Sequence, residues 1–142
     1  MHVRFVWVAT FFAVFFWAVT VSWVFLPTEL MAFSGLPADD GAGLANGLRI
    51  GGMLLGWGVM LFLARREPPS RARNAIAIGS AVGLYGFLLV GLYLLIAGIV
   101  GPGMLMSMAV ELLGGTAFLL TLREPVDRRA AGREAEHTRQ AS

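Results

Sequence analysis

Residues 44–64 read LANGLRIGGMLLGWGVMLFLA, and this stretch of 21 residues contains one charged side chain, Arg49. About 20 mainly apolar residues form a helix long enough to cross the roughly 30 Å hydrocarbon core of a bilayer. Three further stretches have the same character, at residues 5–26, 75–97 and 104–122. The pattern therefore predicts an all-α fold, a bundle of four transmembrane helices.

The composition of the chain is that of one small membrane domain. Of its 142 residues, 57% are hydrophobic and 14% are charged, whereas soluble proteins contain about 25% charged residues. We expect the membrane domain at residues 1–122 and a polar tail at 123–142. A cleaved signal peptide is the alternative for the first stretch, but the stretch exceeds the usual 7–15 apolar residues, and Pro27-Thr28-Glu29 is not a small-residue cleavage site.

The arginines follow a pattern that predicts the orientation in the membrane. The first connection holds three acidic residues and no basic one, and the third holds no charge. The basic residues at the other positions are Arg4 before the first span, Arg65, Arg66, Arg71 and Arg73 in the second connection, and Arg123, Arg128, Arg129, Arg133 and Arg139 after the fourth span. The positive-inside rule then predicts that both termini and the second connection are cytoplasmic.

Two segments outside the spans also allow predictions. In the first connection, Leu30, Met31, Phe33 and Leu36 form an apolar patch. It either packs over the mouth of the bundle, which we favour, or forms a helix in the membrane interface. The tail at 123–142 is expected to be a solvated helix end followed by disorder. Its arginines would suit anionic lipid headgroups, while its interleaved acids argue against a nucleic-acid partner.

The glycines predict close helix packing, because small residues let membrane helices approach one another. GxxxG spacings occur at Gly47–Gly51, Gly52–Gly56 and Gly79–Gly83. On the first span we expect a narrow face of small and polar residues to meet the bundle and the bulky residues to meet lipid. The expected inner face consists of Ala9 or Thr10, Ala13, Trp17 and Thr20, and the expected lipid-facing residues are Phe5, Phe11, Phe12, Phe15, Phe16 and Phe25. Trp7 and Trp23 are expected near the two membrane interfaces.

Arg49 and Glu111 are the only charged residues within the expected spans, and they have opposite signs. A charge at the centre of a bilayer costs roughly 2.5–3.5 kcal/mol on insertion scales, so it usually has a partner or a function. From the cytoplasmic arginines, Glu111 is about 18 Å and Arg49 about 24 Å along its helix, at 1.5 Å per residue. A long arginine side chain can reach across that difference. A pair between them is therefore possible.

Three interpretations of these two residues remain open. They form a structural ion pair that fixes helix register, or they line a polar cavity, or Arg49 extends to the outer headgroups. In the cavity, Arg49 would hold an anionic or polar ligand and Glu111 would bind a proton or a cation. We expect the Arg49 face and the Glu111 face to point inward. The residues expected to support the site are Asn46, Tyr85 and Ser107.

Other kinds of site are not predicted. The chain has no cysteine, which excludes disulfides and thiolate metal sites. Its histidines, His2 and His137, lie outside the spans, which excludes bis-histidine haem ligation within the bundle. One carboxylate within the spans cannot form a carboxylate pair or a two-metal site. No catalytic residues are predicted, so an enzyme is not expected unless a bound cofactor of unknown kind does the chemistry.

The layout resembles the DoxX-like family of small four-helix bacterial membrane proteins over about residues 5–122. The similar features are Leu48-Arg49-Ile50-Gly51-Gly52, the glycines continuing to Gly58, the arginine-rich turn at 64–74 and the single Glu111. Pro27 and the following residues 29–36 resemble the outer loop of the family. The resemblance implies a bundle in the bacterial inner membrane and, for DoxX itself, association with thiol or sulfur redox and with quinones. This chain departs from that chemistry because it has no cysteine.

The functional prediction is an accessory or small-ligand-binding membrane protein with a polar centre of Arg49 and Glu111. The alternatives are a small proton-coupled carrier that uses Glu111 and a structural subunit of a larger complex. Small multidrug transporters also have four spans, but they depend on a carboxylate in the first helix, which this chain lacks. The expected partners are membrane lipid, a small polar or anionic ligand and another membrane protein.

Overall fold

The computed structural model describes residues 4–37 and 41–122, and within these ranges the chain is all-α. The helices run in chain order as α1 (Phe5–Phe25), α2 (Pro27–Phe33), α3 (Gly41–Ala64), α4 (Arg71–Ile96) and α5 (Met104–Thr121). The four long helices correspond to the four expected spans, and all four are long and apolar enough to cross a membrane. The chain therefore has the architecture of a multi-pass membrane protein, with one additional short helix. The tail at 123–142 lies outside the described residues.

The helix ends follow local capping chemistry. The main difference from the predicted spans is α4, which begins at Arg71 because the Ser70 side chain accepts a hydrogen bond of 3.1 Å from the Arg73 amide. Such caps stabilise the first turn of a helix. Gly35 after α2 and Gly98 after α4 have φ of 75° and 69°. Both occupy the left-handed position that commonly ends a helix and that glycine adopts without strain.

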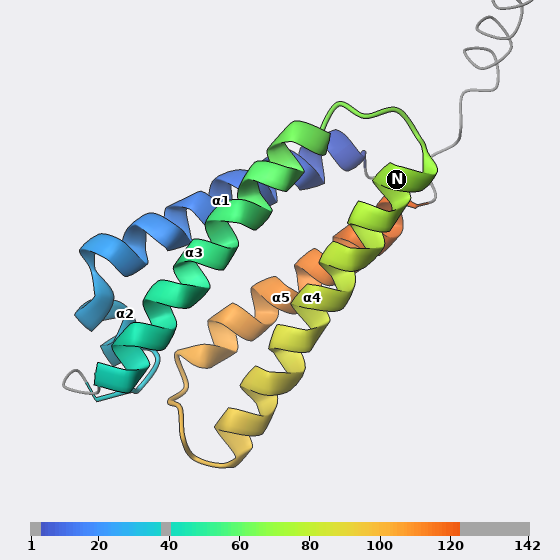
Figure 1. Cartoon of the computed structure of the whole chain (residues 1–142). Coiled ribbons are helices and arrows are strands. Elements are labelled where there is room, and N and C mark those ends of the chain that lie inside the picture. The colour runs from blue at the N-terminus through green and yellow to red at the C-terminus, as the bar shows by residue number, and fades with distance from the viewer. Residues whose placement is uncertain (1–3, 38–40, 123–142) are drawn as a thin grey trace, which may run out of the picture.

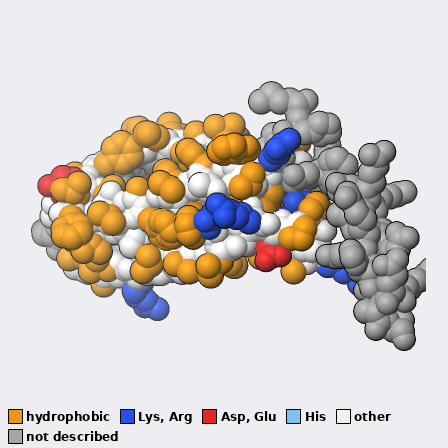
Figure 2. All heavy atoms as spheres, turned by 90° about the horizontal axis from the view of Figure 1, so that it is seen from above, with side chains coloured by type: hydrophobic (Ala, Val, Ile, Leu, Met, Phe, Trp, Pro, Cys, Tyr) orange, Lys and Arg blue, Asp and Glu red, His pale blue; other side chains and the backbone are white. Residues whose placement is uncertain are grey.

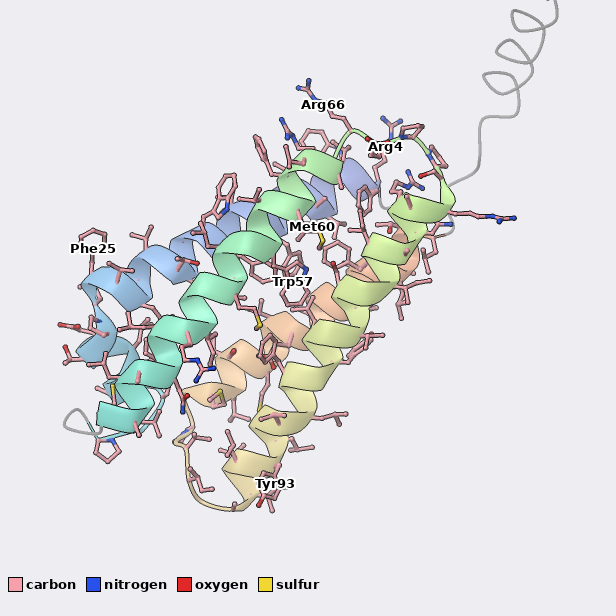
Figure 3. All side chains as sticks on the ribbon, in the orientation of Figure 1. Arg4, Phe25, Trp57, Met60, Arg66 and Tyr93 are labelled. Atoms are coloured by element: carbon pink, nitrogen blue, oxygen red, sulfur yellow. The ribbon has the colours of Figure 1, made fainter. Side chains whose placement is uncertain are left out.

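The four long helices form two antiparallel pairs. Helix α1 packs along α3, and α4 packs along α5 (Figure 1). We call the end of the molecule with Arg4 and the α3–α4 connection the arginine end. Figure 3 labels Arg4 and Arg66 there, and Phe25 and Tyr93 at the far end. At the arginine end, the guanidinium of Arg73 lies 5.3 Å from the centre of the Phe5 ring, within cation–π range.

Helix α1 buries the small face that the sequence suggested and, in addition, three phenylalanines that were expected to meet lipid. Ala9 and Ala13 are buried as expected, and Phe11 and Phe25 are exposed as expected. The expectation that Phe5, Phe12 and Phe16 meet lipid is wrong, because all three are buried in the core. The Phe12 ring fills the space beside Gly114 on α5, while the Phe5 and Phe16 rings pack on Phe118 and Trp57.

Five glycines of the described helices leave room for an aromatic ring of a neighbouring helix. A Cβ at Gly47 would overlap the Trp23 ring, and one at Gly114 would overlap the Phe12 ring. The same relation holds for Trp17 on Gly58, Trp57 on Gly83 and Tyr85 on Gly115. Gly47 and Gly51 thus pack as the spacing predicted, whereas Gly52, Gly56 and Gly79 have open space beside them. Trp23 packs on Gly47 and Gly51 of α3, and Trp7 is 71% exposed.

The surface between the two ends is mainly apolar. Large hydrophobic side chains are exposed along all four long helices, among them Trp7, Leu63, Leu89, Ile96 and Leu113. Figure 2 shows such side chains over most of the face that it presents. A continuous exposed apolar surface of this extent is unusual for a soluble monomer and suits contact with lipid.

We predict that the hydrogen bond from Trp57 to Ser80 contributes measurably to stability. The indole N–H of Trp57 on α3 donates to the buried Ser80 hydroxyl on α4 over 3.1 Å. Hydrogen bonds between membrane helices contribute about 0.6 kcal/mol on average and at most about 1.7 kcal/mol. Ser80→Ala should therefore lower the free energy of unfolding by about 1 kcal/mol, measured by denaturant titration in mixed micelles.

Trp57→Phe is the matched variant, because it removes the same bond and keeps an aromatic ring. The double variant should lose less stability than the two single variants lose together. The difference, which is the coupling energy of the two side chains, should be about 0.6 kcal/mol. A coupling energy of zero would show that the bond contributes nothing.

Candidate functional site

The two helix pairs meet at the arginine end through a layer of phenylalanines. The ring centre of Phe118 on α5 lies 5.4 Å from that of Phe12 and 6.4 Å from that of Phe5, both on α1. All three side chains are buried. This layer closes the space between the pairs at that end.

At the far end, α2 joins the pairs by packing on the α4–α5 connection. The Gly101 amide donates a hydrogen bond of 2.8 Å to the Ser34 carbonyl. The neighbouring contact, between Gly103 and Phe33, requires glycine, because a Cβ at Gly103 would overlap the Phe33 carbonyl oxygen. Met31 of α2 is only 1% exposed. The predicted apolar patch thus forms a helix, as in the alternative interpretation, and covers the mouth of the bundle, as in the favoured one.

Between these two closures lies a hollow of about 430 Å³, which we call the central cavity. Its volume is within the range of about 300–1,000 Å³ found for ligand pockets. All five helices contribute to its wall, with α1 and α4 giving their C-terminal halves and α3 and α5 their N-terminal halves. The lining residues are Phe15, Phe16, Val19, Trp23, Leu30, Phe33, Ser34, Ile50, Leu54, Leu84, Phe87, Val90, Gly91, Leu94, Gly103, Met104, Met106, Ser107, Val110 and Glu111.

Glu111 is the one charged residue in this wall. Its Oε1 accepts a hydrogen bond of 3.1 Å from the Ser107 hydroxyl, one helical turn earlier. Its Oε2 is buried and has no hydrogen-bond partner among the described residues. A buried carboxylate oxygen without a partner is costly. The cavity therefore presents an acceptor that a proton, a water molecule or a donor group of a ligand could satisfy.

Arg49 lies elsewhere. It is exposed on α3, it does not line the central cavity, and no ion pair joins it to Glu111 in the described part of the chain. The expectation that the Arg49 face points inward is wrong, because Gly47, Gly51 and Gly58 form the face that packs on α1. The functional roles of Arg49 and Glu111 stay a prediction.

The three expected supporting residues lie in three different surroundings. Ser107 lines the cavity and contacts Glu111 directly. Tyr85 is half-buried between α4 and α5, where its hydroxyl lies 3.0 Å from that of Thr116. Asn46 is exposed on α3, on the side of Arg49. Of the five predicted site residues, the structure brings together only Glu111 and Ser107.

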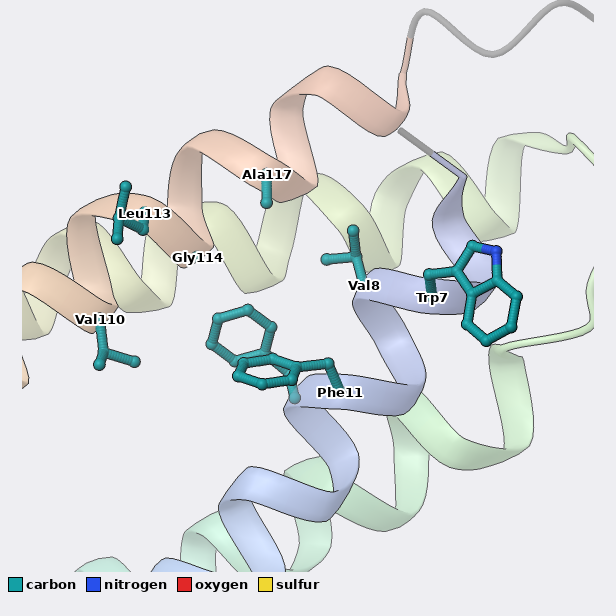
Figure 4. A pocket seen from close by; sticks show the side chains of 8 residues that line it. Trp7, Val8, Phe11, Val110, Leu113, Gly114 and Ala117 are labelled. Carbon is teal, nitrogen blue, oxygen red and sulfur yellow. The ribbon is translucent and has the colours of Figure 1, made fainter. Parts of the chain in front are cut away.

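A second hollow lies between α1 and α5 toward the arginine end (Figure 4). It has a volume of about 400 Å³, and its wall is almost entirely apolar. Trp7, Phe11 and Leu113 on its rim are all more than 60% exposed. A shallow apolar groove on the outer face suits lipid chains, and it offers no group that would select one ligand.

The sequence did not reveal the aromatic wall of the central cavity. Phe15, Phe16, Trp23, Phe33 and Phe87 line it from three different helices, α1, α2 and α4. The available signal was the pairing of bulky residues with glycines, but the sequence does not say which ring meets which glycine. Among the residues that the structure describes, no cluster of three histidine or acidic side chains could hold a metal ion.

Comparisons with protein-family models, with curated proteins and with solved structures found no match for this chain. The functional argument therefore rests on the site itself.

Proposed function

We propose that this chain is a multi-pass protein of a bacterial inner membrane that binds one small, mainly apolar ligand in the central cavity. Glu111 is the polar contact for this ligand, and Ser107 orients the carboxylate. The resemblance to the DoxX-like family, drawn from the sequence, is part of the proposal for the location in the cell. The role is that of an accessory or ligand-binding protein.

The observation that carries the proposal is the partnerless Oε2 of Glu111 at a cavity of about 430 Å³. A polar group in an apolar pocket fixes the orientation of a ligand and gives specificity. A carboxylate kept for structure alone would be expected to have both oxygens hydrogen-bonded. Here one oxygen accepts a hydrogen bond within the helix, and the other has no partner among the described residues.

The proposed orientation places the arginine end in the cytoplasm, following the positive-inside rule. The central cavity then lies in the outer half of the membrane. Glu111 is seven residues from the start of α5 at Met104, or about 10 Å at 1.5 Å per residue. Arg49 lies at a similar height on α3, and its long side chain extends to outer headgroups.

The test is retention of a small molecule by the full chain, purified from native membranes in mild detergent and examined by native mass spectrometry. We expect one added mass per chain. Val19→Trp should abolish it, because Val19 lines the cavity and a larger side chain fills the hollow. Val21→Trp is the matched control, since Val21 is 54% exposed and lies outside the cavity wall. Loss of the mass in both variants, or its presence in both, would contradict the proposal.

A second candidate function is a proton-coupled carrier, favoured by the same Glu111 oxygen, which can accept a proton. It differs in what Glu111→Gln does. A carrier loses transport while it stays folded and inserted, whereas a ligand-binding protein loses only affinity. Proton uptake by vesicles that contain the purified chain separates the two.

A further inference from the structure

We infer that the ligand of the central cavity is a lipophilic organic cation, such as an amine or quaternary ammonium group on an apolar body. This inference rests on the proposed function and names the ligand class for the same site. It is carried by the charge of the cavity, its aromatic wall and its openings.

The first argument is charge. The wall contains one carboxylate, Glu111, and no basic residue. Arg49, the other charge within the spans, is exposed on α3 and outside the wall. An anion in the cavity would meet the carboxylate without any compensating group, and a neutral ligand without a hydrogen-bond donor would leave Oε2 unpaired. A monocation neutralises the carboxylate in a surrounding of low dielectric, where such a pair is strong.

The second argument is the aromatic wall. Five of the lining residues are aromatic: Phe15, Phe16, Trp23, Phe33 and Phe87. The negative faces of aromatic rings attract cations, and cages of such rings are a recurring way to bind quaternary ammonium groups. The Phe16 ring is further fixed by Trp57, whose ring centre is 4.8 Å away. The rings thus supply apolar contact for the body of the ligand and attraction for its charge.

The third argument is access. Four lining residues, Phe33, Ile50, Val90 and Met106, are between 38% and 67% exposed. The cavity is therefore closed at its two ends and open through the side of the bundle. In the proposed orientation this side opening faces lipid, so the ligand must partition into the bilayer. A cation with an apolar body does so, whereas a small hydrated ion does not.

The experiment compares two probes of equal shape, benzyltrimethylammonium and its neutral carbon analogue neopentylbenzene. Binding to the full chain in phosphatidylcholine nanodiscs is measured by calorimetry, with empty nanodiscs subtracted. We expect the cation to bind at least about tenfold more tightly than the neutral probe, as one charge pair plus ring contacts would give. In Glu111→Gln the preference should fall below about threefold, whereas Glu111→Asp should keep it, which controls for loss of folding.

The outcomes separate this inference from the proposed function. Equal affinity for both probes, or a cation preference that Glu111→Gln leaves unchanged, overturns the inference. If Val19→Trp still excludes both probes in that case, the cavity remains a ligand site and the proposed function stands. If neither probe binds, the cation inference is overturned, and the proposed function is then decided by the mass-spectrometric test.

Discussion

Replacing Gly103 with alanine is expected to lower the free energy of unfolding by about 1–3 kcal/mol, the usual penalty of overpacking. The new methyl group would overlap the Phe33 carbonyl oxygen, a backbone atom that cannot rotate away. Backbone conformation does not contribute, because the φ of −57° and ψ of −28° at Gly103 suit any residue. The α2 helix should therefore move off the α4–α5 connection. Thermal unfolding in micelles gives the loss, and cation binding should weaken in parallel because the cavity loses its cover.

Gly86→Ala is the matched control for this prediction. Gly86 lies within α4 and has no atom of another element within 4 Å of the position of a Cβ. Alanine there should be neutral or stabilising, since glycine is the poorer helix former by roughly 0.8–1 kcal/mol. Equal effects of the two substitutions would mean that the close contact of α2 with Gly103 does not hold the far end together.

Removing the charge of Glu111 is expected to stabilise the chain while it abolishes cation binding. In Glu111→Leu, a half-buried carboxylate with one partnerless oxygen, Oε2, is replaced by an apolar side chain. The cost of roughly 2.5–3.5 kcal/mol for inserting a charge at the bilayer centre sets an upper limit on the gain in stability. The gain should be smaller than this limit, because the cavity is partly open. We therefore expect an increase of about 1–2 kcal/mol in the free energy of unfolding, measured by denaturant titration. Higher stability with lost binding is the expected signature of a functional site.

Arg49→Leu provides the comparison for Glu111→Leu. Arg49 is exposed and does not line the cavity, so its replacement should change stability by less than about 0.5 kcal/mol. If the two residues formed a buried ion pair instead, each single substitution would destabilise the chain by about 3–5 kcal/mol. Destabilisation by both variants, with rescue when the two charges are exchanged, would restore the ion-pair interpretation.

The sequence predicted the four long helices because an uninterrupted apolar run of about 20 residues is typical of a membrane-spanning helix. It predicted the start of α4 less well, since the cap at Ser70 extends the helix beyond the apolar run. The region of the short helix α2 was recognised as an apolar patch, and the favoured interpretation, packing over the mouth of the bundle, did not predict that it forms a helix. Its tight docking depends on Gly101 and Gly103, which are far away in the sequence and gave no local signal.

For the site, the sequence identified Glu111 and Ser107 but misplaced Arg49. Two glycine stripes on α3 were available for packing, Gly47–Gly51 and Gly52–Gly56. The first is used because it accepts the ring of Trp23, and this choice turns Arg49 outward. The preference cannot be read from α3 alone, since it depends on the rings that α1 presents. The same dependence hid the inner phenylalanines Phe12 and Phe16.

The docking of α2 on the α4–α5 connection has a consequence for how the protein is made. Helices α1 and α3 leave the ribosome first, and they can associate at once as neighbours along the chain. Their cavity-facing side chains, such as Phe16 and Leu54, can rest in lipid without penalty, because hydrocarbon tails are as apolar as they are. Helix α2 can dock only after Gly101 and Gly103 have been synthesised. The central cavity is therefore completed last, when the hairpin of α4 and α5 enters the bilayer.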